Sequence, residues 1–256
     1  MMGDLFDRHP VKEPRRRRGV FLLPSLITVG NLFCGYACMV YSMNGRLEQA
    51  APFIGVAILL DMLDGRIARL TNTTSSFGIE FDSLADVVSF GAAPAVMAFK
   101  WGLSGLGEMG WAAGFIFLGA SAMRLARFNI QTSTQLDKRY FVGMPTPAAA
   151  GVVAATVYAV PALPENHQAF AAMAVMLVPA ALMVSVIRFR SFRTINFGWG
   201  RSYLPLFLFI LLLAFIATKP KVTCLLLAYA YLLSGFIEWG ITRWRTRRDG
   251  RPAASS

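Results

Sequence analysis

The chain has 256 residues, of which 55% are hydrophobic and only 15% are charged, and its mean hydropathy is +0.51. This composition is too apolar for an ordinary soluble domain and indicates an integral membrane protein. The net charge is +11, but the basic residues flank apolar runs, where membrane topology and anionic lipid headgroups account for them better than nucleic acid does. The three cysteines lie within apolar runs without metal-binding spacing and are expected to be packing residues.

Residues 1–19 are polar and end in four consecutive arginines, directly before the first apolar stretch. That stretch, residues 20–41, is longer than the core of a signal peptide, and further apolar stretches follow it, so we expect an uncleaved first span. The predicted organisation is a basic cytoplasmic N-terminal segment (1–19), a transmembrane domain (20–241) and a basic cytoplasmic tail (242–256).

Eight apolar stretches approach the ~20 residues that a membrane-crossing helix needs. They are residues 20–41, 50–70, 82–101, 111–129, 146–163, 169–187, 202–218 and 222–241. We therefore predict an all-α integral membrane protein, a bundle of about eight transmembrane helices. An even number of spans puts both termini on one side, and a cytoplasmic N-terminus leaves only four of the 25 basic residues outside: Arg46, Lys100, Lys219 and Lys221. The positive-inside rule thus favours a multi-pass protein of the cytoplasmic (inner) membrane with both termini in the cytoplasm.

Four of the fourteen acidic residues are aspartates that lie between residues 61 and 86, in sequence that is otherwise apolar. At ~100° per residue, Asp61 and Asp64 share one face of the second predicted helix. Asp82 and Asp86 are spaced by four, so they line one stripe of the next helix if that helix begins early enough. The topology places all four carboxylates at the cytoplasmic ends of two neighbouring helices, directed toward a common point.

Four carboxylates in a low-dielectric setting repel one another, which implies a bound cation. Oxygen ligands without nearby Cys or His suit Mg²⁺ or Mn²⁺ rather than Zn²⁺. Arg69 adds a positive charge suited to phosphate oxygens. Gly65 and Gly78 allow a ligand or a second helix to come close. These residue types together indicate a site for phosphoryl transfer.

The spacing of this motif resembles the full signature of the CDP-alcohol phosphatidyltransferases, whose fixed positions correspond to Asp61, Asp64, Gly65, Ala68, Arg69, Gly78, Asp82 and Asp86. The resemblance covers most of the chain and implies a six-helix family core, to which the eight predicted spans add two. Several strings look like the bacterial membrane-integrated phosphatidylserine synthases, namely PSLITVGNLFCGY, DSLADVVSFGAAPA, RLARFN and FVGMPTPAAA.

The resemblance implies an enzyme that transfers the phosphatidyl group of CDP-diacylglycerol, a membrane lipid, to the hydroxyl of L-serine, giving phosphatidylserine and CMP. It implies that the four aspartates hold one or two Mg²⁺ or Mn²⁺ ions and that Asp86 is also the general base. It further implies a homodimer, and contacts of CDP-diacylglycerol with Thr28, Asn31, Gly65, Arg69, Ser75 and Gly78. Arg124 and Arg127, at the end of the fourth predicted span, are candidates for contact with the serine carboxylate or a phosphate; the alternative is that they are snorkelling residues at the interface.

Three alternatives stay open at this point. The first keeps the reaction and changes the acceptor to glycerol 3-phosphate, inositol phosphate or choline. The second is a cation transporter whose intramembrane carboxylates form an ion pathway, although all four lie at one end of the bundle. The third is a structural membrane protein whose aspartates are paired with arginines.

Overall fold

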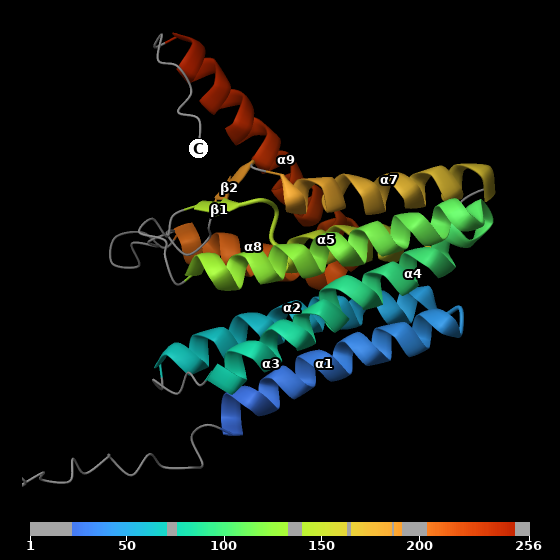
Figure 1. The fold of residues 1–256 in the computed structure, drawn as a ribbon, viewed down its shortest axis with the longest axis horizontal. Helices are drawn as coiled ribbons and strands as arrows, with labels where there is room; N and C mark the ends of the chain where they lie inside the picture. Colours follow the sequence, from blue (N-terminus) through green and yellow to red (C-terminus); the bar gives the residue numbers. More distant parts are fainter. Residues whose placement is uncertain are drawn as a thin grey trace, which may run out of the picture.

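The computed structural model describes residues 22–70, 76–132, 140–162, 165–185, 187–190 and 204–248. The described chain is a bundle of helices with one short sheet (Figure 1). In chain order its elements are α1 (Leu22–Met43), α2 (Leu47–Leu70), α3 (Ser76–Asp86), the π-helix η2 (Val87–Ala92), α4 (Ala93–Trp101), the 3₁₀-helix η3 (Leu103–Leu106), α5 (Glu108–Thr132), β1 (Tyr140–Val142), α6 (Thr146–Ala159), α7 (Glu165–Val184), β2 (Arg188–Arg190), α8 (Leu204–Thr218) and α9 (Pro220–Arg248).

Eight helical segments match the eight predicted stretches, because α3, η2 and α4 form one continuous span. Five segments of the described chain are long and apolar enough to cross a membrane: Ser25–Met43, Phe77–Trp101, Glu108–Ile130, His167–Val184 and Pro220–Ile237. The protein is therefore a multi-pass membrane protein. Helix α2 is long enough, but it carries the charged residues of the aspartate motif. Helix α6 has 14 residues, which at 1.5 Å per residue span about 21 Å, less than the ~30 Å hydrocarbon core.

Two features of the fold depart from the sequence prediction. Helix α3 begins at Ser76, six residues before the predicted start of the third span, so the condition set for Asp82 and Asp86 to line one stripe of that helix is met. Strands β1 and β2 pair antiparallel, with Tyr140 opposite Arg190 and Val142 opposite Arg188, so the described chain is not purely helical. The prediction missed this sheet because each strand has only three residues.

The core depends on small side chains, which allow the helices to pack closely. Such packing matters in a bilayer, where the hydrophobic effect does not drive helices together. Helix α1 packs along α2 and also against α3, η2 and α4, while α6 packs against α2 and α9. Buried alanines occur on several of these helices, and Phe90, Phe117 and Met97 fill the larger spaces between them. Helix α1 is thus the common neighbour of the two helices that carry the aspartates.

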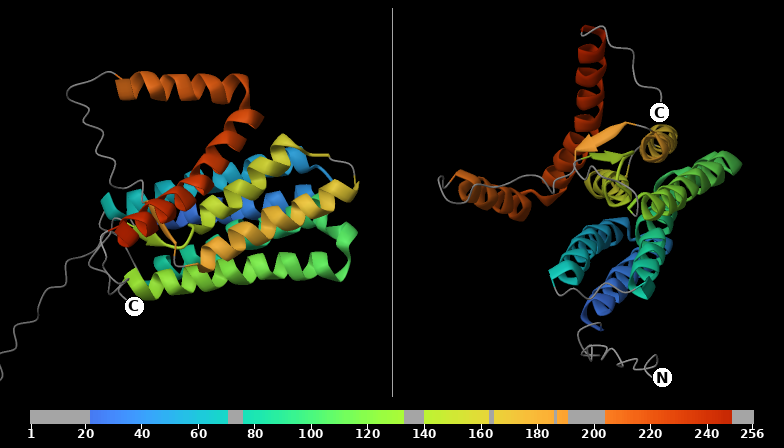
Figure 2. Two further views of the ribbon diagram at one scale, coloured as in Figure 1. Left: turned by 90° about the horizontal axis from the view of Figure 1, so that it is seen from above. Right: turned by 60° about the vertical axis from the view of Figure 1, so that its left-hand side comes forward.

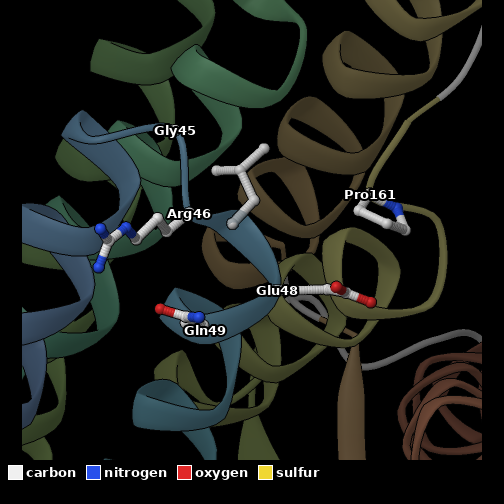
Figure 3. Close-up of a pocket in the computed structure, with 6 residues that line it drawn as sticks. Gly45, Arg46, Glu48, Gln49 and Pro161 are labelled. Carbon is white, nitrogen blue, oxygen red and sulfur yellow. The ribbon is translucent and has the colours of Figure 1, made fainter.

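Several interhelical turns meet at the end of the bundle remote from the aspartates. Lys221 at the start of α9 forms an ion pair with Glu48 at the start of α2. Trp101 Nε1, at the end of α4, donates a hydrogen bond of 2.8 Å to the carbonyl oxygen of Val160, after α6. A pocket of about 250 Å³ lies at the same end, and Figure 3 shows Glu48 extending toward Pro161 while Arg46 points to the opposite side. This pocket lies at the start of α2, whereas Asp61 and Asp64 lie in the second half of that helix.

Helix α8 packs mainly against α9, whereas α9 also packs against α6 and β2. Figure 2 shows α8 beside the bundle and the C-terminal part of α9 projecting from it. The described side chains of α8 are nearly all apolar and exposed, among them Phe207, Ile210 and Phe215. In a bilayer such side chains face lipid, so this exposure agrees with a membrane location.

Candidate active site

Three of the four predicted aspartates converge at one end of the bundle. Asp61 and Asp64 lie near the end of α2, and Asp82 lies on α3. Each contributes one carboxylate oxygen to a group in which all three oxygens lie within 4.8 Å of one another. Because α1 packs against both helices, it holds these carboxylates together despite their repulsion.

Asp86 lies one helical turn beyond Asp82, at the end of α3, and its residue surface is only 7% exposed. Its charge interacts with those of Asp61, Asp82 and Asp64, although it is not one of the three residues whose oxygens meet. The structure thus gives a group of three carboxylates with a fourth beside it. The position of Asp86 outside the group of three suits a role separate from theirs.

Helix α1 supplies polar partners to the aspartates. Thr28 Oγ1 donates a hydrogen bond of 3.1 Å to Asp64 Oδ2, and Asn31 Nδ2 donates one of 3.1 Å to Asp86 Oδ1. Thr28 and Asn31 are buried and are three residues apart, so they lie on neighbouring positions of one helix face. Both were predicted as nucleotide contacts, and the structure shows in addition that they orient two of the carboxylates.

The remaining carboxylate oxygens test whether the site suits a cation. Asp64 Oδ1 and Asp82 Oδ1 are buried and have no hydrogen-bond partner within the described residues. A buried carboxylate oxygen without a partner is costly, and a bound cation removes that cost. The group contains oxygen ligands only, which is the donor set of a hard divalent ion. These residues therefore fit a divalent metal.

The structure separates the two predicted arginines. Arg124 is only partly exposed; its Nη1 donates a hydrogen bond of 3.0 Å to Thr146 Oγ1 on α6, and its Nε is buried with no hydrogen-bond partner in the described part of the chain. Its charge interacts with those of Asp86 and Asp61 and with the hydroxyl group of Tyr231 on α9. Arg127 is exposed. Arg124 therefore faces the aspartates, whereas Arg127 faces outward.

The other predicted contacts are placed only in part. Gly65 on α2 and Gly78 on α3 are both partly exposed. Gly65 directly follows Asp64 in the sequence, and Gly78 lies one helical turn before Asp82. Ser75 lies outside the described residues, and so does the side chain of Arg69. Their roles stay predictions.

Sequence reasoning missed several polar residues around the site. Ser89 Oγ donates a hydrogen bond of 2.9 Å to the carbonyl oxygen of Asn31, and Asn129 Nδ2 donates one of 2.8 Å to Ser83 Oγ. Ser83 and Ser89 are hydroxyl residues in the apolar run around Asp86, and that pattern is the signal that could have identified them. Thr146 and Tyr231 had no comparable signal, because their relation to Arg124 depends on helices distant in sequence.

Comparison with known proteins places this geometry in a family. The model of the CDP-alcohol phosphatidyltransferase family matches residues 21–187, which is more than half of the chain. The chain belongs to the CDP-alcohol phosphatidyltransferase family. The match includes α1 to α7 and the whole aspartate motif, and it confirms the resemblance drawn from the motif.

Individual family members are similar over much of the chain. A CDP-diacylglycerol–serine O-phosphatidyltransferase of Helicobacter pylori (strain ATCC 700392 / 26695) is 37% identical over 227 residues, which cover 86% of this chain and 92% of the relative. The enzyme of that name from Mycobacterium leprae is 41% identical over 143 residues, covering 54% of this chain and 47% of the relative. The one from Saccharomyces cerevisiae is 38% identical over 148 residues, covering 52% of each chain.

Proposed function

We propose that this protein transfers the phosphatidyl group of CDP-diacylglycerol to the hydroxyl of L-serine, giving phosphatidylserine and CMP. The observation that carries the proposal is the similarity to the Helicobacter pylori serine enzyme over 86% of this chain. The convergence of Asp61, Asp64 and Asp82 beside Asp86 supports the reaction class. Of the acceptors considered from the sequence, serine is the one that the relatives' names favour.

We assign the binding of one or two divalent ions, Mg²⁺ or Mn²⁺, to Asp61, Asp64, Asp82 and Asp86. Such ions, when bound, offset the charge of the diphosphate and of the leaving CMP. The unpartnered oxygens of Asp64 and Asp82 support this assignment.

In the proposed reaction, Asp86 accepts the proton of the serine hydroxyl. The serine oxygen forms a bond to the phosphorus that carries diacylglycerol, and the bond from that phosphorus to the bridging oxygen breaks, so that CMP leaves with that oxygen. A neutral hydroxyl is a poor nucleophile, so a carboxylate within hydrogen-bond distance is needed to accept its proton. Because Asn31 binds one oxygen of Asp86, the carboxylate has a fixed orientation toward the acceptor.

CDP-diacylglycerol is proposed to bind beside the aspartates, next to the cytoplasmic end of α2 and the start of α3. The proposed contacts are Thr28, Asn31, Gly65, Arg69, Ser75 and Gly78. Each buried CH₂ of a lipid is worth ~0.8 kcal/mol, so the acyl chains stay in the bilayer while the headgroup enters the site. A site at one end of the bundle, near the membrane surface, suits this division.

For the serine carboxylate we favour Arg124 over Arg127. Arg124 lies close enough to Asp86 for their charges to interact, and its Nε has no hydrogen-bond partner among the described residues. A guanidinium binds a carboxylate through parallel hydrogen bonds. Serine would then lie between the arginine, which binds its carboxylate, and Asp86, which meets its hydroxyl.

The topology that we propose puts the aspartates and both termini on the cytoplasmic side of the inner membrane. The basic residues favour this orientation, because only Arg46, Lys100, Lys219 and Lys221 would lie outside. We keep the predicted limits of the basic segments, 1–19 and 242–256, around a domain of eight spans with a six-helix family core. A homodimer is part of the same proposal.

The test is an assay of the purified full-length protein in detergent micelles with CDP-diacylglycerol and radiolabelled L-serine. We expect CMP release that depends on serine, and label in phosphatidylserine. Parallel reactions with glycerol 3-phosphate, inositol phosphate and choline identify the acceptor. CMP release that follows one of these alcohols and not serine would replace the serine assignment, and release of no CMP with any of them would contradict the reaction class.

A further inference from the structure

A chain of hydrogen bonds connects η2, α1 and the end of α3. Ser89 in η2 donates to the carbonyl oxygen of Asn31 at 2.9 Å, and Asn31 Nδ2 donates to Asp86 Oδ1 at 3.1 Å. Ser89 and Asn31 are both 0% exposed. The hydroxyl of Ser89 is therefore connected to the carboxylate of Asp86 through a single residue of α1.

Gly35 makes room for this connection. In an α-helix the carbonyl of Asn31 accepts the N–H of the residue four positions later, which is Gly35. A Cβ on Gly35 would lie 2.5 Å from Ser89 Oγ and 2.7 Å from Ser89 Cα. Both distances are shorter than real Cβ contacts, so any larger residue at this position must move η2 away from α1. The two helices therefore lie in close contact at Gly35, one helical turn from Asn31.

The π-helix contributes to the same geometry. The N–H of Ala93 bonds to the carbonyl of Val88, five residues earlier, and η2 begins directly after Asp86. Single π turns inside α-helices are frequent at functional sites. Here Asp86 and Ser89, three residues apart across the start of the π turn, both contact Asn31.

We propose that Ser89 is a positioning residue, which, through Asn31 and the close contact at Gly35, holds the Asp86 carboxylate for proton transfer from the acceptor alcohol. The inference rests on the proposed function, because it takes Asp86 as the base. It extends the site to residues outside the aspartate motif. A displacement of a reacting group by 1 Å costs about 100-fold in rate, so a contact that fixes Asn31 affects turnover more than binding.

The first test compares Ser89→Ala with wild type in steady-state assays of CMP release by the full-length protein. We expect kcat to fall about tenfold, with KM for both substrates unchanged, because one hydrogen bond that positions the base is lost. The double variant Asn31→Ala/Ser89→Ala should have the kcat of Asn31→Ala alone, because Ser89 acts through Asn31. Independent, multiplying effects of the two substitutions would overturn the proposal.

The second test separates the helices without removing a hydrogen-bonding group. Gly35→Ala should lower kcat at least as much as Ser89→Ala, whereas Gly55→Ala, where the added methyl has no atom from another part of the described chain within 4 Å, should keep the wild-type kcat. Equal kcat for the two alanine variants would contradict the proposed contact. If Gly35→Ala does not fold, the double-variant comparison still decides, because Ser89→Ala removes only a hydroxyl.

The two proposals fail in different ways. Serine dependence is measured on the wild-type protein, and the kcat ratios are measured with whichever acceptor the wild type uses. Activity of the wild type together with an unchanged kcat of Ser89→Ala overturns the positioning role alone. Absence of CMP release from the wild type with every acceptor overturns the proposed function and this inference with it.

Discussion

Asn31 Nδ2 and Asp86 Oδ1 are joined by a buried hydrogen bond of 3.1 Å between residues 55 positions apart. This bond links the first membrane helix to the end of α3, and the bond of Thr28 to Asp64, at 3.1 Å, links the same helix to α2. A helix without acidic residues therefore orients the carboxylates of two others. Helix α1 is part of the active site that we propose, although it contributes none of the aspartates.

Replacing Asp86 by Asn tests its assignment as the base. The amide has the size of the carboxylate and can still accept the hydrogen bond from Asn31, but it takes up no proton, so we expect kcat to fall about 10²–10⁴-fold. Binding of CDP-diacylglycerol, measured by equilibrium binding of a labelled analogue, should be partly retained. Glu80→Gln is the matched control, because Glu80 is an exposed acid on the same helix and should have wild-type turnover. Wild-type kcat in Asp86→Asn would refute the assignment.

Thr28→Val tests whether α1 supports the metal site. The substitution removes the hydroxyl that donates to Asp64 Oδ2 and keeps a similar side-chain size. Partners that orient metal ligands typically contribute about 10–100-fold in metal affinity, so the half-saturating Mn²⁺ or Mg²⁺ concentration should rise by about tenfold, while kcat at saturating metal changes little.

The control for Thr28→Val is Thr223→Val on α9, whose hydroxyl bonds to the carbonyl of Lys219 at 2.8 Å, at the other end of the bundle. It should leave the metal dependence of activity unchanged. An equal change in both variants would mean that the effect of Thr28 is a general effect of losing a buried hydroxyl.

The aspartate site could be predicted because its information is local. Asp61 and Asp64 are close in sequence and so are Asp82 and Asp86, so helical spacing alone put each pair on one face. The number of helical segments followed in the same way from runs of apolar residues. The family resemblance then added Thr28 and Asn31, which the structure places next to the aspartates.

What the sequence could not supply depends on contacts between distant segments and on small departures from regular geometry. The spacing of apolar residues after Asp86 does not distinguish a π turn from an α-helix, so the sequence did not reveal the π turn. The contact of Ser89 with Asn31 could therefore not be predicted. The choice between Arg124 and Arg127 depends on Thr146 and Tyr231, which lie on α6 and α9. Which face of α5 lies toward α6 and α9 is known only once these helices are packed together.

Metal removal provides a prediction with a readout other than activity. A chelator should abolish CMP release, and Mg²⁺ or Mn²⁺ should restore it. Metal at 100 times its Kd should also stabilise the folded protein by about 2.7 kcal/mol, seen as a higher Tm in a thermal-shift assay. Asp82→Asn should lose that increase, because Asp82 is one of the three converging carboxylates that we propose to bind the metal, whereas Glu108→Gln, an exposed acid at the start of α5, should keep it. Activity that is indifferent to chelators would contradict the metal assignment.

Arg124→Gln tests the proposed recognition of the serine carboxylate. The substitution removes the positive charge near Asp86 and keeps a polar side chain at this position. Hydrogen bonds to charged groups contribute about 1.5–3 kcal/mol, so the KM for serine should rise at least tenfold. The KM for CDP-diacylglycerol should stay near its wild-type value, because the arginine is proposed to bind the acceptor and not the nucleotide.

Two comparisons make this last prediction specific to the carboxylate. Arg127→Gln removes an exposed charge three residues later on the same helix and should leave the KM for serine unchanged. Ethanolamine has the hydroxyl and amino groups of serine but no carboxylate, so the preference of the enzyme for serine over ethanolamine should fall in Arg124→Gln and persist in Arg127→Gln. If only Arg127→Gln lost the preference for serine, the carboxylate contact would be assigned to Arg127 instead. If both variants kept the preference, neither arginine would be the carboxylate contact.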